Sequence, residues 1–431
     1  MLTRVESGDR TPSVAKPLFQ SVRGMHDILP EESTRWETVE RAFREVVGLY
    51  NYGEVRIPVL EATDLFTRSI GDETDIVGKE MYSFTDTGGD ALTLRPEGTA
   101  GAVRAYVEHA VGALEPVTKW YYLGPMFRRE RPQKGRYRQF HQAGAEAFGA
   151  PPPLVDAEQV VMLADFLGRV GLEATILWNH LGGRDARERY RARLVSHYEA
   201  REERLCDDCR RRLRTNPLRL LDCKVGSCVE MKADAPGMRE SLGEEDLSTM
   251  DRFRALAAAG GVRLREEERL VRGLDYYTGI VYEAEVMAAG GPVVVAGGGR
   301  YDELVGRLGG PETLATGFAI GLERVVECMQ ASGPLVLDLF VLVPSSEAEV
   351  EAARIVGEAR RAGIRVDVDP RGGSVKAQMK RAHKLGARLV AILGEEETSR
   401  GKVSVKEMEK GDQVEVPAGD LVGHVLGRLG R

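Results

Sequence analysis

The stretch that decides the fold, residues 127–146, reads FRRERPQKGRYRQFHQAGAE. Two β-type runs flank its basic centre, so we expect a β-hairpin with Gly135 near its tip. Residues 80–148 as a whole alternate short β-type runs with polar turns, as in MYSFTD and ALTLRP. This alternation predicts an α+β domain built on an antiparallel sheet, because a parallel sheet would need a helix between successive strands.

A period of two along each strand places chemically matched side chains on one face of the hairpin. Arg128 and Glu130 would share a face of the first strand. On the return strand, the residues that would share a face are Phe140, Gln142, Gly144 and Glu146. Arginine offers a planar donor fork to phosphate oxygens and a carboxylate accepts from an ammonium group, so the hairpin suits a phosphate-bearing substrate with a cationic end. A solvated, charged hairpin is the weaker alternative, given the aromatic and proline residues in the stretch.

The elements around the hairpin follow from periodicity. Apolar residues recur at helical spacing over 35–51, which predicts a helix. A β-type run follows at 54–60, and Pro58 within it implies a sheet edge or a subunit boundary, because proline lacks a backbone donor. We further expect strands at 174–181, 281–283 and 293–295 and a helix over 317–329.

The composition changes twice along the chain. Residues 183–262 are charged and helical, which indicates an insertion into a first domain that spans 17–332 after a flexible tail at 1–16. Gly333 and Pro334 mark a linker. From 336 to 431 strands and helices alternate, which predicts a small α/β domain with a largely parallel sheet. Its expected strands are 339–343, 364–369 and 388–393, and its expected helices are 347–362 and 374–385.

Composition narrows the class of protein. Hydrophobic residues make up 42% of the chain and charged residues 29%, the balance of a globular protein rather than a disordered one. No apolar run approaches the ~20 residues of a membrane span, and no secretory signal opens the chain, so we expect a cytoplasmic location. The net charge of −7 argues against a general nucleic-acid coat protein, but it does not exclude a nucleic-acid partner at a local basic surface.

The hairpin resembles motif 2 of the class II aminoacyl-tRNA synthetases, in the version found in histidyl-tRNA synthetases. Other segments match the same family in the expected order. They are RGMHDILP (23–30), VRIPVLE (55–61, resembling motif 1 with its dimer-interface proline), LVRGLDYY (270–277, the histidine signature), GGGRYD (297–302, the second signature) and GFAIGLER (317–324, resembling motif 3). The likeness covers almost the whole chain after the tail.

The resemblance implies an enzyme that activates L-histidine with Mg²⁺-ATP and transfers it to tRNA(His). It assigns the α-phosphate of ATP to Arg128 and the γ-phosphate to Arg324, with Glu130 also in the ATP site. Arg272 would lie near the reacting carboxylate and the α-phosphate. Fixed guanidinium groups of this kind stabilise the charge that develops on phosphorus without reorganising. Mg²⁺ would offset the charge of the β- and γ-phosphates.

The resemblance also implies a histidine pocket. Glu97, Thr99 and Gln142 would serve the ammonium end, and Glu146 and Tyr277 the imidazole ring. The complete set expected for the amino acid is Glu97, Gly98, Thr99, Gln142, Glu146, Tyr276 and Tyr277. A carboxylate can orient one ring N–H while a tyrosine hydroxyl meets the other nitrogen. Residues 297–299 are three glycines, which suit a tight turn, and beside the signature we favour a loop that brings the backbone close to the substrate.

Two basic surfaces are candidates for the tRNA. The hairpin loop would meet the acceptor end through Gln133, Lys134, Arg136 and Arg138. The family places its anticodon-binding domain at 336–431, where Lys376 and Lys380 lie on one side of an expected helix. On spacing alone these lysines would be read as solvated. Motif 1 further implies a homodimer.

Four of the five cysteines cluster, at Cys206, Cys209, Cys223 and Cys228. The spacing C-x2-C, thirteen residues, then C-x4-C permits a tetrahedral zinc site, although the second pair is looser than in common zinc motifs. Four reduced thiols in a small helical module are the alternative.

A non-catalytic relative is the main alternative function. The regulatory subunit of ATP phosphoribosyltransferase resembles the synthetase core but does not aminoacylate. That relative usually lacks the C-terminal domain and loses the catalytic arginines. Here Arg128, Arg272 and Arg324 are all present, which favours the working synthetase.

Overall fold

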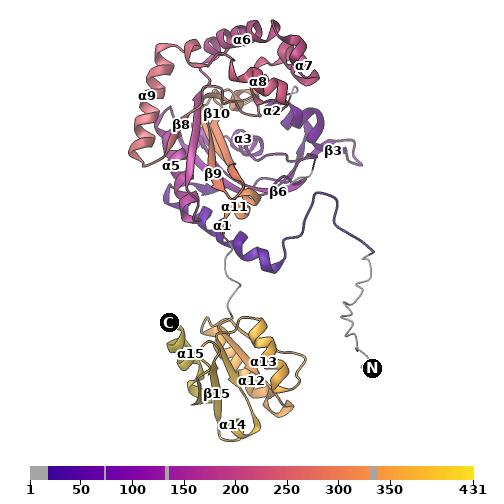
Figure 1. Cartoon of the computed structure of the whole chain (residues 1–431), viewed down its shortest axis with the longest axis vertical. Coiled ribbons are helices and arrows are strands. Elements are labelled where there is room, and N and C mark those ends of the chain that lie inside the picture. The colour runs from indigo at the N-terminus through magenta and orange to yellow at the C-terminus, as the bar shows by residue number, and fades with distance from the viewer. Residues whose placement is uncertain (1–17, 72–73, 132–134, 331–336) are drawn as a thin grey trace, which may run out of the picture. The chain divides into compact units, whose positions relative to one another are not determined.

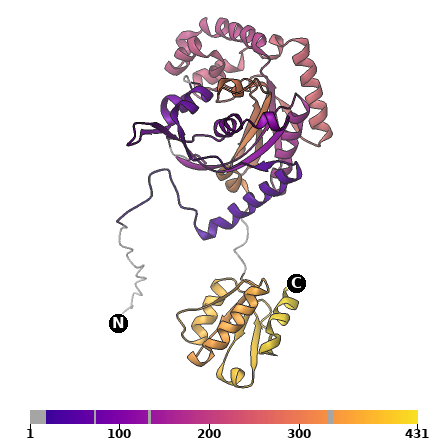
Figure 2. The same ribbon diagram turned by 180° about the vertical axis from the view of Figure 1, so that it is seen from behind.

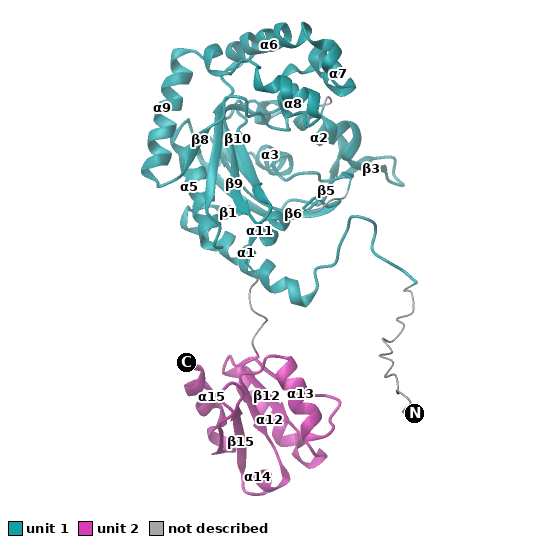
Figure 3. Ribbon diagram, viewed as in Figure 1, with its two compact units in different colours: residues 1–330 teal, residues 331–431 magenta. Residues whose placement is uncertain are grey.

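The computed structural model describes residues 18–71, 74–131, 135–330 and 337–431, in two compact units divided between Gln330 and Ala331 (Figure 3). The tail expected at 1–16 lies outside the described residues. Among the described residues, no helix has both the length and the apolar character that a membrane crossing requires.

Unit 1 is built on an eight-stranded sheet with the order β1-β5-β6-β11-β10-β9-β7-β8 (Figure 1). Neighbouring strands are antiparallel except for the two outermost pairs, β1 with β5 and β7 with β8. The strands are β1 (Gly53–Glu54), β5 (Thr118–Phe127), β6 (Gln139–Phe148), β7 (Ala174–His180), β8 (Leu264–Glu266), β9 (Thr278–Ala288), β10 (Gly291–Arg300) and β11 (Ala315–Gly321). The expected α+β fold on an antiparallel sheet is confirmed.

The β5–β6 hairpin forms as predicted. Gly124 pairs with Gln142 and Phe127 with Gln139. Gly135 lies in the connecting loop with a φ of 70°, a left-handed conformation that glycine adopts without strain. The alternation along β6 is also as expected, because Ala143 and Ala145 pack into the main hydrophobic core while Gln142 lines a cavity on the other face.

Helices cover one face of this sheet. Side chains of α1 (Pro30–Leu49), α5 (Leu154–Arg169), α9 (Glu244–Ala259) and α11 (Leu322–Cys328) share the main core with the strands. The views from front and back both place α1, α5 and α9 on this side (Figures 1 and 2). On the opposite side, α3 (Thr99–Glu108) and α10 (Leu304–Arg307) pack with a cluster of buried tyrosines. The cavity therefore lies on the face that the large helices leave open.

Smaller elements complete this open face. A three-stranded sheet has the order β2-β4-β3, and short helices flank it. These elements are β2 (Leu60–Ala62), α2 (Thr63–Ile70), the π-helix η1 (Ile76–Glu80), β3 (Tyr82–Thr85), β4 (Ala91–Leu94) and α4 (Val111–Leu114). Pro58 lies between β1 and β2, outside both strands, so the single strand expected at 54–60 is two short edge segments instead.

The charged segment after β7 forms a helical module. Its elements are α6 (Arg184–Glu199), η2 (Glu202–Arg204), α7 (Asp207–Thr215), η3 (Pro217–Asp222), α8 (Gly226–Ala233) and η4 (Arg239–Ser241). The module has its own core, in which Tyr190, Leu194 and Leu221 are fully buried. By contrast, α9 contributes Phe253 to the core of the main sheet.

Two local expectations are wrong. Residues 317–321 belong to strand β11, so the helix expected from 317 begins only at Leu322. A short, largely buried apolar run does not reveal its period, so the sequence does not distinguish a strand from a helix here. The glycines at 297–299 are part of the central strand β10 rather than a loop. A Cβ on Gly298 would lie 2.3 Å from the Gly317 carbonyl oxygen, so the close approach of β11 requires glycine there.

Unit 2 is a five-stranded sheet with the order β13-β12-β14-β15-β16. The first three strands are parallel, as expected, and β15 and β16 continue the sheet in antiparallel fashion. Its elements are β12 (Leu339–Leu342), η5 (Ser346–Ala348), α12 (Glu349–Arg361), β13 (Val366–Val368), α13 (Val375–Lys384), β14 (Leu389–Ile392), α14 (Glu395–Ser399), β15 (Lys402–Glu407), β16 (Gln413–Pro417), η6 (Ala418–Asp420) and α15 (Leu421–Leu429). Helices α12 and α15 share one core, and α13 packs on a second around Phe340.

Candidate active site

A cavity of about 250 Å³ lies over β6, β9, β10 and β11. The hairpin loop and the segment that precedes β9 form its walls. The residues that line it are Ile76, Glu97, Thr99, Arg128, Glu130, Gly135, Arg136, Tyr137, Phe140, Gln142, Arg272, Gly273, Leu274, Tyr276, Tyr277, Glu283, Val294, Val295, Ala296, Gly297, Ala319, Gly321, Glu323 and Arg324. The structure thus brings together most of the residues that the sequence singles out, from segments far apart in the chain.

Two of the three expected arginines are held by backbone carbonyls. Arg128 donates from Nε to the Pro96 carbonyl at 2.8 Å, and its guanidinium lies 5.3 Å from the centre of the Phe140 ring. Arg324 donates from Nη1 to the Val294 carbonyl at 2.8 Å. Burial, and then the nearby Arg136, lower the pKa of Arg324. Both guanidinium groups are therefore fixed in place while keeping other N–H donors for an anion.

Arg272 also lines the cavity, between a carboxylate and an aromatic ring. It forms an ion pair with Glu283 and lies 5.9 Å from the centre of the Tyr277 ring. Its Nε is buried and has no hydrogen-bond partner among the described residues. A Cβ on Gly297 would come within 2.2 Å of Arg272 Nη2, so glycine at this position of β10 leaves the space that Arg272 occupies.

The acidic end of the cavity begins at the N-terminus of α3. The Glu97 carboxylate accepts hydrogen bonds from the backbone N–H groups of Thr99, at 2.6 Å, and Ala100, at 2.8 Å. Burial raises the pKa of Glu97, and these two hydrogen bonds oppose the rise. The neighbouring Gly98 does not line the cavity. A Cβ there would meet the Tyr122 ring at 2.2 Å, so its role is to let α3 approach β5.

Glu146 lies beneath the cavity wall rather than among the lining residues. Its carboxylate accepts hydrogen bonds from the hydroxyls of Tyr301 at 2.5 Å, Thr99 at 2.7 Å and Tyr122 at 3.3 Å. It is fully buried, and burial raises its pKa to about 8. A carboxyl group with this pKa is largely protonated at neutral pH.

Gln142, Tyr276 and Tyr277 complete this end of the cavity. The Gln142 Oε1 is buried and has no hydrogen-bond partner among the described residues. A buried acceptor without a partner is costly unless a ligand supplies a donor. The Tyr276 and Tyr277 rings lie 4.7 Å apart, and burial raises the pKa of both hydroxyls, which keeps them protonated.

Comparison with known proteins gives the family of this chain. The family model for histidyl-tRNA synthetase matches residues 24–325, and an anticodon binding domain matches residues 338–428. The chain is 46% identical over 413 residues to a histidine–tRNA ligase of Anaeromyxobacter sp. (strain K), covering 95% of this chain and 100% of that protein. It is 49% identical over 403 residues to a histidine–tRNA ligase of Sorangium cellulosum (strain So ce56), covering 93% of this chain and 94% of that protein.

A solved structure agrees. Apo histidyl-tRNA synthetase of S. aureus superposes with a TM-score of 0.79 at 35% identity, covering 95% of this chain and all of that chain. This chain belongs to the histidyl-tRNA synthetase family. The family model spans the whole of the cavity described above, from the α1 segment to Arg324.

Of the six residues expected to contact tRNA in this member of the histidyl-tRNA synthetase family, the structure describes four. Arg136 lines the cavity and pairs with Glu130 at 3.2 Å. Arg138 lies at the base of the hairpin, where its Nε approaches the Glu130 carbonyl at 3.4 Å. Gln133 and Lys134 lie outside the described residues. In unit 2, Lys376 and Lys380 are exposed on α13.

Several site residues were not expected from the sequence. Glu283 pairs with Arg272, and Tyr301 and Tyr122 hold Glu146. The Glu323 carboxylate accepts from the backbone N–H of His141 at 2.8 Å, which ties α11 to β6. Tyr301 lies within the second histidine signature, so that motif could have pointed to it. The role of Glu283 depends on strand register, which the sequence did not provide.

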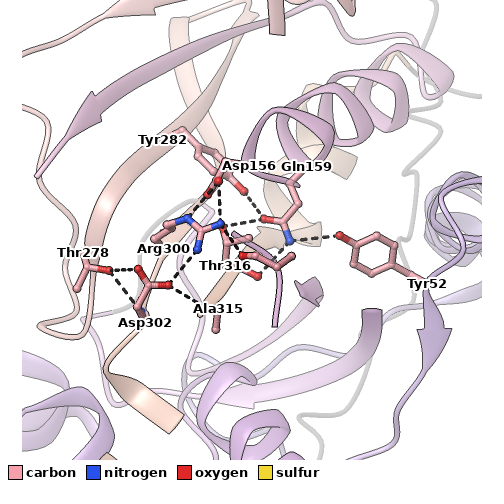
Figure 4. Close-up of polar contacts among 10 residues, drawn as sticks. Tyr52, Asp156, Gln159, Thr278, Tyr282, Arg300, Asp302, Ala315 and Thr316 are labelled. Atoms are coloured by element: carbon pink, nitrogen blue, oxygen red, sulfur yellow. Dashed lines mark hydrogen bonds and ion pairs between the residues drawn. The ribbon is translucent and has the colours of Figure 1, made fainter. Parts of the chain in front are cut away.

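Arg300, in the same signature, lies in a network of polar side chains away from the cavity (Figure 4). Its guanidinium donates to Asp156 Oδ2 at 2.9 Å, to Asp302 Oδ1 at 3.0 Å and to the Ala150 carbonyl at 3.1 Å. Asp302 also accepts from the backbone N–H of Ala315, at the start of β11. Arg300 therefore joins β10, β11 and α5 without reaching the cavity.

The four clustered cysteines lie in the helical module. Their sulfur atoms all lie within 4.8 Å of one another. They are thus brought together as a group that could hold a metal ion.

Proposed function

We propose that this chain is a histidine–tRNA ligase, which activates L-histidine with Mg²⁺-ATP to histidyl-adenylate and then transfers histidine to the 3′ end of tRNA(His). The observation that carries the proposal is the set of side chains that line the cavity. Arg128, Arg272 and Arg324 supply positive charge, and Glu97, Thr99 and Gln142 supply oxygen acceptors. Such a site suits a polyphosphate joined to a cationic amino acid.

The arginines would act on ATP. We assign Arg128 to the α-phosphate and Arg324 to the γ-phosphate, with Arg272 on the other side of the reacting centre. As the histidine carboxylate attacks the α-phosphorus, negative charge grows on its oxygens, and guanidinium groups that are already held in place stabilise it. Pyrophosphate is the leaving group, and Arg324 would stabilise the negative charge on it.

Magnesium would accompany the nucleotide. Carboxylate oxygens are the protein ligands that Mg²⁺ prefers. Glu130 and Glu283 both line the cavity beside the arginines, so the side chains present fit the ion. When bound, Mg²⁺ supplies positive charge that offsets the β- and γ-phosphates.

The acidic end would select histidine. The ammonium group meets Glu97, the Thr99 hydroxyl and the unpaired Oε1 of Gln142. Glu146 and Tyr277 act on the ring side, and the Tyr276 ring packs against Tyr277 and Tyr301. Because Glu146 is buried, we propose that it acts partly through the Thr99 and Tyr122 hydroxyls that it fixes. An analogue without ring nitrogens would leave buried groups unpaired, so discrimination should be strong.

Transfer to tRNA would follow on the same surface. The terminal 3′-hydroxyl attacks the adenylate carbonyl, the bond from this carbon to the phosphate oxygen breaks, and AMP leaves with the hydroxyl proton on a phosphate oxygen. If Glu97→Gln or Gln142→Ala abolished single-turnover transfer while adenylate still bound normally, this choice of base would be wrong. Arg136 and Arg138, with Gln133 and Lys134 in the same loop, would contact the acceptor end. Lys376 and Lys380 of the anticodon-binding unit would contact tRNA phosphates.

A homodimer is the expected assembly. The segment that resembles motif 1 exposes apolar side chains at Val59 and Leu60, and Leu49 at the end of α1 is 83% exposed. These exposed apolar side chains are available to a second copy of the chain. Light scattering should give twice the chain mass, and a monomer at micromolar concentration would contradict the dimer. Since ATP and tRNA are its substrates, we place the protein in the cytoplasm.

The test is histidine-dependent ATP–pyrophosphate exchange with the purified chain. We expect exchange with L-histidine and none with the other amino acids. Absence of exchange would overturn the enzyme and favour a regulatory relative of the kind found with ATP phosphoribosyltransferase. That alternative has less support, because histidine–tRNA ligases match this chain at 46% identity or more across both units.

A further inference from the structure

The four-cysteine cluster lies outside the proposed active site and is built from three segments of the helical module. Cys206 precedes α7 and Cys209 lies on its first turn, while Cys223 follows η3 and Cys228 lies on α8. Cys209 and Cys228 are buried, and Cys206 and Cys223 are partly exposed. The fold therefore converges four sulfur atoms at one point from a span of more than twenty residues.

The spacing of the sulfur atoms fits a tetrahedral metal better than disulfides. All four lie within 4.8 Å of one another, and Cys206 and Cys223 are 3.9 Å apart. In a tetrahedral site with Zn–S bonds of ~2.3 Å, neighbouring sulfur atoms are separated by about 3.8 Å. A disulfide bond would bring two sulfur atoms to ~2.05 Å of each other. All four cysteines are free instead.

A backbone N–H group and a buried tyrosine belong to the surroundings of the sulfur atoms. The backbone N–H of Cys206 donates a hydrogen bond to Cys228 Sγ at 3.4 Å. The Tyr198 hydroxyl is buried and has no hydrogen-bond partner among the described residues. Backbone and hydroxyl donors around the ligands are typical of metal–thiolate sites.

We propose that Cys206, Cys209, Cys223 and Cys228 bind one zinc ion as four thiolates. Binding displaces four thiol protons and leaves the site with a net charge of −2. Four sulfur ligands with no open position make a structural site rather than a catalytic one.

The ion would close a loop that supports the active site. Residues 210–222 lie between the two inner ligands, and this loop contacts the histidine signature twice. Asn216 donates from Nδ2 to Asp275 Oδ1 at 3.0 Å. Arg219 donates from Nη1 to the backbone carbonyl of Arg272 at 3.3 Å. By fixing both ends of the loop, zinc would hold the segment that presents Arg272, Tyr276 and Tyr277 to the cavity.

Metal content tests the site itself and does not depend on the proposed function. Untagged protein purified without chelator should contain one zinc ion per chain, as measured by inductively coupled plasma mass spectrometry. Cys209→Ser and Cys223→Ser should lose it, whereas the matched control Cys328→Ser, on α11, should keep it. Replacement by Co²⁺ in the intact chain should give the visible absorption of a tetrahedral tetrathiolate, which decides the matter even if the serine variants fail to fold. Iron instead of zinc, disulfides, or four free thiols without metal would each overturn the proposal.

Hydrogen exchange tests the support of the signature. Zinc removal by a chelator should raise amide exchange in residues 270–277 at least several-fold, and added zinc should restore protection. Asn216→Ala should raise exchange in the same segment while zinc remains bound. Unchanged exchange after zinc loss would refute the coupling. If histidine-dependent ATP–pyrophosphate exchange is present, zinc removal should also raise the KM for histidine, and a failure of that assay alone would count against the proposed function and not against the zinc site.

Discussion

Arg272 and Arg300 are both largely enclosed by unit 1, one just before β9 and the other at the end of β10, yet their surroundings differ. Arg300 is 1% exposed and donates to two carboxylates and a carbonyl. Arg272 has one carboxylate partner, an Nε without a hydrogen-bond partner among the described residues, and a side chain that is 19% exposed at the cavity.

This difference separates a structural charge from a functional one. The donors of Arg300 are used within the protein. Removal of Arg300 would therefore leave the buried Asp156 carboxylate without this ion pair. The donors of Arg272 are only partly used, so a substrate phosphate can complete them. Both residues lie in segments that resemble histidine signatures, and only their contacts distinguish their roles.

The largest expected effect comes from Arg272→His. Removal of a guanidinium that stabilises the transition state should lower kcat for ATP–pyrophosphate exchange by about 10³-fold. The unfolding midpoint should change little, because the side chain borders the cavity. If activity fell by less than tenfold, the role of Arg272 would be structural, like that of Arg300.

Arg300→Met should show the opposite pattern. Breaking a buried, paired charge should lower the free energy of unfolding by about 3–5 kcal/mol. All three tryptophans lie in unit 1, so their fluorescence in urea reports on this unit alone. The control is Arg307→Met, whose partner Glu303 is 39% exposed at its side chain, and it should cost no more than about 1 kcal/mol. If both substitutions lowered the free energy of unfolding equally, the buried pairs of Arg300 would contribute no more than an exposed ion pair.

Gly297 and Gly298 are neighbours on β10 but face different groups. Gly297→Ala would displace the Arg272 guanidinium, so exchange activity should fall about 10- to 100-fold while the fold persists. Gly298→Ala would instead meet the backbone of β11 and should reduce stability first. Kinetics and urea unfolding of both variants check this. Loss of stability in Gly297→Ala, with normal kcat, would show that Arg272 moves aside freely.

The smallest effect, for each unit of pH, concerns Glu146. Its pKa in the folded protein is about 8, above the ordinary value of 4.5, so the folded state keeps a proton that the unfolded state releases. The associated stability is complete below about pH 4.5 and is lost progressively as pH rises to about 8, by at most about 1.4 kcal/mol per pH unit. Unfolding free energies measured between these limits should show this slope, and Glu146→Gln should reduce it. An unchanged slope in the variant would mean that Glu146 is already ionised in the fold.

The sequence predicted those parts of the site that depend on local geometry. The hairpin, the shared face of Phe140 and Gln142, and the parallel strands of unit 2 follow from turn residues and periodicity. It did not predict the pairing of Arg272 with Glu283, because that contact depends on the register in which Gly297 opposes Glu283. It also assigned β11 to a helix, because the strand is a short, largely buried apolar run whose period the sequence does not reveal. Contacts between distant segments are what periodicity cannot provide.

The position of β11 also constrains the order of synthesis. It lies between β6 and β10 and joins β1-β5-β6 to β10-β9-β7-β8, although it is the last strand of that sheet in the chain. Until residue 321 has left the ribosome, the two halves have no strand to connect them and each exposes an unpaired edge. Pairings between such distant residues form slowly and expose apolar surface meanwhile. Unit 1 is therefore the part of the nascent chain most in need of chaperone protection, whereas the strands of unit 2 all lie within residues 339–417.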